Sequence, residues 1–173
     1  MPHDKIMRDS AKTKGRALLL FGGAVEADAA VVRSFRAAGI DPATIVLADA
    51  NAAKTLRDLL LRIADALDLT VSRNETMLSA AARIGSTMTR RGQTTVHLVD
   101  MYRTTKLSTA STHADFLCAE LFRLLQHWGI SLIVGRQLGP IGIGEIIMER
   151  EFRMVRVEEL SAGDVRYLLG GLW

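Results

Sequence analysis

Five short apolar runs recur along the chain, and helical patterns lie between most of them. The runs are Arg16–Phe21, Thr44–Ala48, Thr94–Val99, Ile130–Val134 and Met154–Val157. A continuous apolar run that ends in Gly or Asp is typical of a strand buried on both faces. Strands that alternate with helices predict an α/β fold, with three layers and a mostly parallel sheet that helices cover on both faces.

The clearest helix has apolar side chains at helical spacing, with charged residues between them. Its stripe is Leu56, Leu59, Leu60, Ile63, Ala64 and Leu67. Helices are also expected over Ala24–Ala38 and Glu75–Arg90, and along a stripe from Leu117 to Trp128. The polar segment Met101–Thr112 has no period and predicts a loop. Ser161 followed by Asp164 predicts a capped helix start.

The candidate site lies where the strands end. In open parallel sheets, ligands bind outside the carboxyl ends of the strands. The candidate cofactor-binding residues at these ends are Gly22, Gly23, Asp49, Asp100 and Arg136. Arg136 belongs to a glycine-rich stretch, residues 135–144, whose glycines would let a ligand or partner approach the backbone.

Two nucleotide-binding layouts begin with a glycine turn after the first strand. A dinucleotide fold needs G-x-G-x-x-G there and an acid that closes the second strand. Asp49 supplies the acid, but the turn lacks the spaced glycines and carries Glu26 and Asp28 where phosphate charge would sit. A Rossmann-like enzyme that binds a nucleotide or another anionic cofactor at this turn remains the alternative interpretation.

The later segments resemble AAA+ ATPases of the TniB and ExeA type, which are transposition helpers and secretion-associated ATPases. Lys54–Leu67 is similar to their helix after the second strand, and Thr95–Asp100 resembles their Walker B strand. Leu121–Gly135 looks like the helix and sensor strand that follow. Glu149–Leu169 is similar to their closing segment, so Arg150 or Arg153 would lie near the arginine that faces a neighbour's nucleotide.

The departures from this family concern its chemistry. The Walker A motif, G-x-x-x-x-G-K-[ST], cradles phosphates with backbone N–H groups, a lysine and a hydroxyl. Here Asp28 stands at the lysine position and Ala29 at the hydroxyl position. Met101 follows the Walker B acid where a glutamate is usual, and the chain ends at Trp173 without the family's lid. We therefore expect weak or absent ATP binding and no hydrolysis, in a protein- or DNA-interaction module that acts as an accessory factor in DNA transactions.

Basic charge is concentrated at the N-terminus. Residues 1–16 contain five basic and two acidic side chains. Their net charge of +3 equals the formal net charge of the whole chain. We expect residues 1–15 to form a flexible basic arm and residues 16–173 to form a single domain. The expected partner contacts are Lys5, Arg8, Lys12, Lys14 and Arg16 in the arm region, with Arg150 and Arg153 in the domain. Such an arm attracts nucleic acid non-specifically, or is merely a solvated tail.

Other site classes are disfavoured. The single cysteine, Cys118, excludes an internal disulfide and predicts a buried, inert thiol. Asp49 and Asp100 could share a metal, but capping of the following loops is favoured, and we expect no metal. His97 is expected to be a core or interface histidine. The apolar runs are too short to cross a bilayer, and no secretory signal is evident, so the expectation is a cytoplasmic protein that contacts no membrane and binds a protein partner or itself.

Overall fold

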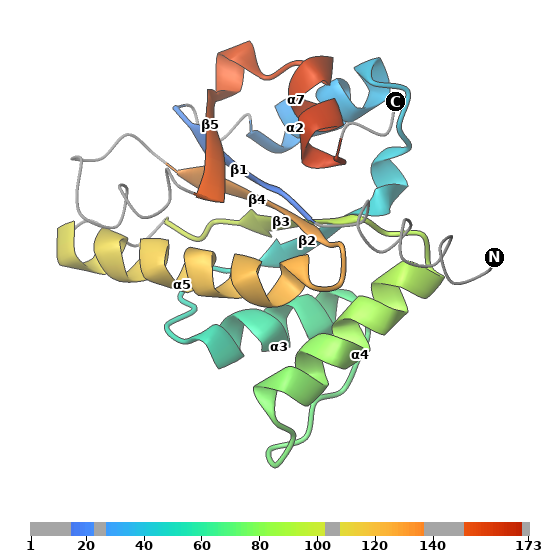
Figure 1. The fold of residues 1–173 in the computed structure, drawn as a ribbon. Helices are drawn as coiled ribbons and strands as arrows, with labels where there is room; N and C mark the ends of the chain where they lie inside the picture. The colour runs from blue at the N-terminus through green and yellow to red at the C-terminus, as the bar shows by residue number, and fades with distance from the viewer. Residues whose placement is uncertain (1–14, 23–26, 103–107, 137–150, 171–173) are drawn as a thin grey trace.

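The computed structural model describes residues 15–22, 27–102, 108–136 and 151–170 (Figure 1). Its sheet has five strands, which are β1 (Ala17–Phe21), β2 (Ile45–Asp49), β3 (Thr95–Val99), β4 (Ser131–Arg136) and β5 (Phe152–Arg156). The strand order is β2-β3-β4-β1-β5, and each neighbouring pair in the described sheet is parallel. All five carboxyl ends therefore lie at one edge of the sheet.

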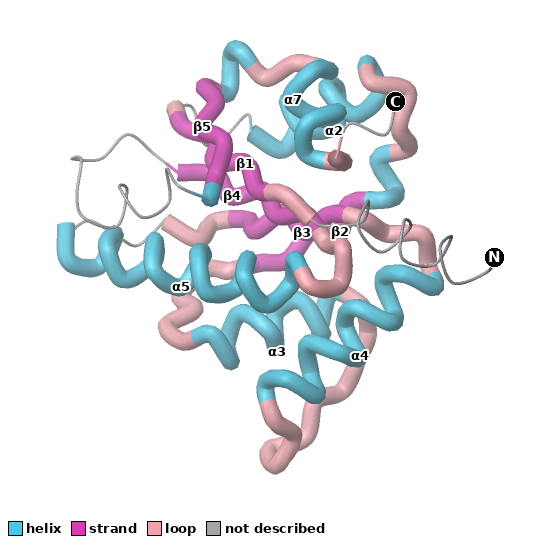
Figure 2. The backbone as a smooth tube through the Cα atoms, viewed as in Figure 1, coloured by secondary structure: helices cyan, strands magenta, loops and turns pink. Residues whose placement is uncertain are grey.

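Helices cover both faces of the sheet (Figures 1 and 2). On one face lie α2 (Ala27–Ala37) and α7 (Ala162–Leu168), and on the other lie α3 (Leu56–Ala66), α4 (Met77–Arg90) and α5 (Ser108–Gln126). Two short 3-10 turns, η2 (Pro42–Thr44) and η3 (Val157–Glu159), flank β2 and β5. The chain thus has the three-layer, parallel α/β fold of the P-loop NTPase-like class that the sequence predicts.

The alternation of side chains along the strands splits the core into two clusters. On β1, Ala17 and Leu19 pack with α3, α4 and α5, whereas Leu18 and Leu20 pack with α2 and α7. Both clusters are apolar, which explains why β1 reads as a continuous apolar run.

The strand order differs from that of the common Rossmann fold. In the Rossmann order 3-2-1-4-5-6, strand 1 lies beside strand 2. Here β1 lies between β4 and β5, and β2 pairs with β3 instead. The strand order therefore does not support the Rossmann-like alternative, although the turn after β1 still lies at the carboxyl edge of the sheet.

The predicted loop over Met101–Thr112 is wrong at its C-terminal end, because α5 begins at Ser108. The hydroxyl-rich start hides the helix, since Ser and Thr favour caps and turns. Packing of Ala114, Leu117 and Leu121 into the core holds the rest of α5 on the sheet. The predicted helical stripe from Leu117 to Trp128 is too long at its C-terminal end. Helix α5 ends at Gln126, so Trp128 lies beyond the helix.

Strand β5 is displaced from its predicted bounds. It begins at Phe152, two residues earlier than expected, and pairs Phe152 with Ala17. Phe152 is buried against Phe122, with ring centroids 5.6 Å apart. The predicted start of α7 is confirmed, since the Asp164 carboxylate accepts the backbone N–H of Ser161 at 2.9 Å.

Candidate functional site

The carboxyl edge of the sheet brings Gly22, Asp49, Asp100 and Arg136 to one side of the molecule, because each closes or follows a parallel strand. Gly22 adopts φ +81°, a conformation that suits glycine, and among the described residues a Cβ there would meet only Glu158 Oε1, at 3.8 Å. Gly23 lies outside the described residues. The backbone of Arg136 pairs with Phe21 at the end of β4. The first residue after β1 therefore has a left-handed backbone conformation.

An acid from the first turn of α2 faces a buried histidine on β3. Asp28 Oδ1 lies 3.4 Å from Nδ1 of His97, whose side chain is 2% exposed, while that of Asp28 is 54% exposed. Burial lowers the pKa of His97, and the Asp28 carboxylate opposes that shift to a smaller extent. Since its ordinary pKa is already below neutrality, the imidazole is uncharged at pH 7.

The buried Nδ1 atom of His97 has no hydrogen-bond partner among the described residues. Asp28 lies beside this uncharged imidazole, in the first turn of α2. His97 is a buried histidine, as predicted.

The two acids that close β2 and β3 are both exposed. Asp49 Oδ1 accepts the backbone N–H of Asn51 at 2.9 Å, which caps the turn after β2. Asp100 has φ +59°, an unusual conformation for a residue with a side chain. Among the residues that the structure describes, no three His, Cys, Asp or Glu side chains gather as metal ligands. The favoured capping role of Asp49 agrees with this geometry.

A buried polar cluster lies just beyond β3. The hydroxyl of Tyr102 donates to Asp115 Oδ1 and lies 3.9 Å from Cys118 Sγ. Burial is the main cause that raises the pKa of Tyr102, so the phenol stays protonated. Cys118 is fully buried, as predicted. No sequence pattern marks Tyr102, because only the packing of α5 beside the end of β3 brings it to Asp115.

Two of the expected partner-contact arginines bind within the chain. Arg16 and Arg153 each place a guanidinium 4.8 Å from the centroid of the Tyr167 ring. Arg153 also pairs with Asp164, at 3.1 Å. These contacts hold α7 near β5. A partner contact by Arg16 or Arg153 stays a prediction. Arg150, Lys5, Arg8, Lys12 and Lys14 lie outside the described residues.

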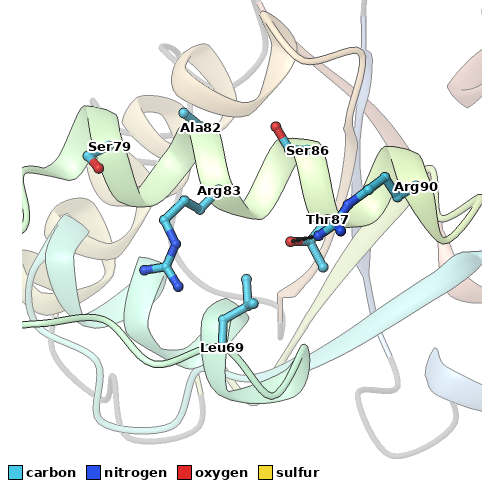
Figure 3. A pocket seen from close by; sticks show the side chains of 7 residues that line it. All are labelled: Leu69, Ser79, Ala82, Arg83, Ser86, Thr87 and Arg90. Carbon is cyan, nitrogen blue, oxygen red and sulfur yellow. Dashed lines mark hydrogen bonds between the residues drawn. The ribbon is translucent and has the colours of Figure 1, made fainter.

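A groove of about 340 Å³ runs along α4, far in sequence from the predicted site (Figure 3). Leu69 forms one wall, and side chains of α4 that include Arg83, Thr87 and Arg90 form the other. Arg83 is already bonded to the Glu75 carboxylate and to the carbonyl oxygen of Thr70. The groove is thus lined by polar and apolar side chains, and its Arg83 guanidinium is already paired with the Glu75 carboxylate.

No protein family model matches the sequence, and no curated protein is similar to it. Among solved structures, a chain in the structure of Drosophila ORC bound to GC-rich DNA and Cdc6 is similar, with a TM-score of 0.47 and 14% identity. The alignment covers 91% of this chain and 58% of that chain. The present chain therefore spans less than two thirds of that neighbour, and the likeness carries no information about function.

In the part of the chain that the structure describes, no helix is long and apolar enough to span a bilayer.

Proposed function

We propose that this chain is a non-hydrolysing P-loop-like domain that acts by binding a macromolecular partner. The observation that carries the proposal is the Asp28 carboxylate in the first turn of α2, facing the uncharged His97. A phosphate at this turn would meet a side chain of like charge, which opposes its binding. A scaffold of the P-loop class with such a turn is better suited to contact than to catalysis.

Exposed apolar side chains support a protein partner. They occur on the strand edge, on the α3–α5 layer and in the turn after α5, and comprise Leu47, Leu61, Met77, Leu78, Phe116 and Trp128. Four of them, Leu61, Met77, Leu78 and Phe116, belong to α3, α4 and α5, so this layer is the expected contact face. A role as an accessory factor in DNA transactions, in the cytoplasm, completes the proposal and rests on the resemblance to the transposition-helper group.

The charge at the turn can be tested directly. We expect the melting temperature of the wild-type protein to be unaffected by Mg·ATP, because a ligand stabilises only a fold that binds it. Asp28→Lys should introduce a measurable ATP-dependent rise. Asp65→Lys makes the same charge change on the exposed face of α3 and should not. ATP turnover by the wild type that Asp100→Ala abolishes would overturn the proposal.

Nucleic acid is a second candidate partner, favoured by the basic residues Lys5, Arg8, Lys12 and Lys14. Binding through them should weaken with salt, with a log–log slope of about 0.9 per phosphate contacted. Replacing all four by Gln should flatten that slope in a fluorescence anisotropy titration of duplex DNA. Arg33→Gln with Arg36→Gln, on the exposed face of α2, is the control. No binding at low salt would exclude DNA and leave a protein partner.

The alternative is an enzyme that binds an anionic cofactor above Gly22 and Asp49. The left-handed backbone of Gly22, directly after β1, is the observation that favours it. It requires cofactor-dependent thermal stabilisation, so a flat melting temperature across NAD(P), S-adenosylmethionine and nucleotides would exclude it.

A further inference from the structure

The free edge of the described sheet is β2, which pairs with β3 on one side only. Val46 and Ala48 point toward α3 and are buried in the core. Leu47, the middle residue of β2, points to the opposite face, where it is 56% exposed. An apolar side chain is therefore left in water at the centre of a sheet edge.

The backbone of β2 shows which residues are available for a new partner. Ala50 donates its N–H to the carbonyl of Val99 at 2.8 Å, and the carbonyl of Thr44 accepts from Thr94 at 2.9 Å. Because backbone groups alternate in direction along a strand, the even-numbered residues face β3 and the odd-numbered ones face outward. Ile45 uses its N–H on Pro42. The outward groups of Leu47 and Asp49 have no hydrogen-bond partner among the described residues.

The two edges of the sheet are protected differently. Along β5, Arg153 pairs with Asp164 and Arg156 lies over the Phe21 ring, so charged side chains occupy that edge. Strand β2, with the sequence IVLAD, contains no Lys, Arg or Pro, and its one charged side chain, Asp49, stands at its C-terminal end. Proteins commonly use charged residues and Pro to prevent edge-to-edge pairing, and the centre of β2 lacks them.

We propose that β2 forms a homodimer interface by antiparallel pairing with β2 of a second copy, about a two-fold axis at Leu47. In this register each outward-facing residue lies opposite another outward-facing residue, as antiparallel hydrogen-bonded pairs require. Leu47 lies opposite Leu47 of the partner subunit, and Ile45, whose N–H already donates to Pro42, lies opposite Asp49 of the partner subunit. An axis centred on Val46 or Ala48 would also pair outward-facing residues, but only a centre at Leu47 places the two exposed Leu47 side chains directly opposite each other.

The side chains fit the same register. A two-fold axis perpendicular to the sheet places both copies of Leu47 on one face, where each covers the other's exposed surface. Val46 and Ala48 meet on the opposite face and extend the apolar cluster under α3. The two sheets become one continuous sheet with β2 at its centre. The proposal is independent of nucleotide or DNA binding.

The oligomeric state tests the interface. Sedimentation velocity of the full chain should show a dimer that dissociates on dilution, and Leu47→Lys should abolish it, because two lysines would then face each other at the axis. Leu78→Lys, at a side chain 74% exposed on α4, should leave the dimer intact. Thermal melts check that both variants fold. A wild type that is monomeric at every concentration, or a Leu47→Lys variant that still dimerises, overturns the proposal.

Cysteine crosslinking tests the register. Cys118 is fully buried, so an introduced surface thiol is the reactive one among the described residues. Leu47→Cys should crosslink to itself on oxidation, since paired Cα atoms lie about 5.5 Å apart, within disulfide range. Ile45→Cys and Asp49→Cys should each fail alone and crosslink when mixed. Self-crosslinking of Ile45→Cys, or none by Leu47→Cys, would contradict the register.

Discussion

His97 is buried on β3, and its Nδ1 atom lies 3.4 Å from Oδ1 of Asp28. Its depressed pKa means that the unfolded chain binds a proton that the folded chain resists, so stability rises with pH. The contribution is complete above the ordinary histidine pKa of about 6.5 and is lost as the pH falls below it. Each unit of depression corresponds to about 1.4 kcal/mol.

We therefore expect the melting temperature to fall on acidification through that range, and His97→Leu to reduce the fall. Urea unfolding at pH values on both sides of about 6.5 measures the effect. His127→Leu changes an exposed histidine and should keep the wild-type slope. An identical pH dependence in wild type and His97→Leu would show that His97 carries no part of it.

Gly85 illustrates a glycine that packing requires. A Cβ at this position of α4 would lie 2.5 Å from Cγ and 2.9 Å from Cβ of Trp128. A rotamer change cannot move the Trp128 Cβ atom, so Gly85→Ala should shift the backbone at Trp128, even though alanine is favoured over glycine in helices by about 1 kcal/mol.

The expected result is a lower melting temperature with a red-shifted tryptophan emission. The chain has two tryptophans, so a Trp173→Phe background isolates Trp128. Gly163→Ala, in α7, is the control, because its nearest new contact is an ordinary 3.5 Å to Ser161 Oγ. An unchanged emission spectrum in Gly85→Ala would contradict the close approach.

At the scale of elements, helix α3 begins with a complete capping box. Thr55 Oγ1 accepts the backbone N–H of Asp58 at 3.0 Å, and Asp58 Oδ2 accepts the N–H of Thr55 at 3.1 Å. Thr55→Ala should lower the free energy of unfolding by about 1 kcal/mol, because it removes a side-chain acceptor at an N-cap. Equilibrium urea unfolding measures this change, and Thr55→Ser should restore most of it. Equal losses in both variants would show that the hydroxyl is not the cause.

Regular helices and strands were predictable where the pattern was local. The α3 stripe from Leu56 to Leu67 and the β1 run needed no tertiary information. The start of α5 did not follow from the sequence, since its first turn carries polar side chains, which favour caps and turns. The start of β5 depended on the fit of Phe152 against Phe122, which lies far away in sequence.

At the scale of the whole molecule, one sheet carries both apolar clusters. Leu60 belongs to the cluster on the α3 face and Phe35 to the cluster on the α2 face. Both faces share the same strands, so we expect one cooperative transition, in line with the prediction of a single domain. Leu60→Ala and Phe35→Ala should each lower the free energy of unfolding by about 2–5 kcal/mol. Circular dichroism in urea checks this, and a second transition in either variant would indicate two units.

The sequence by itself determined the α/β class, the helices with a clear period, the carboxyl-edge position of Gly22, Asp49 and Asp100, and the presence of an acid, Asp28, soon after the first strand. Those properties depend on residue type and on periodicity, both of which are local. Only the tertiary structure decided the strand order, the approach of Asp28 to His97, the contact of Tyr102 with Asp115, and the exposure of Leu47 on a free edge. Each of these depends on which distant segments lie side by side, and that choice is made by packing the whole chain around one sheet.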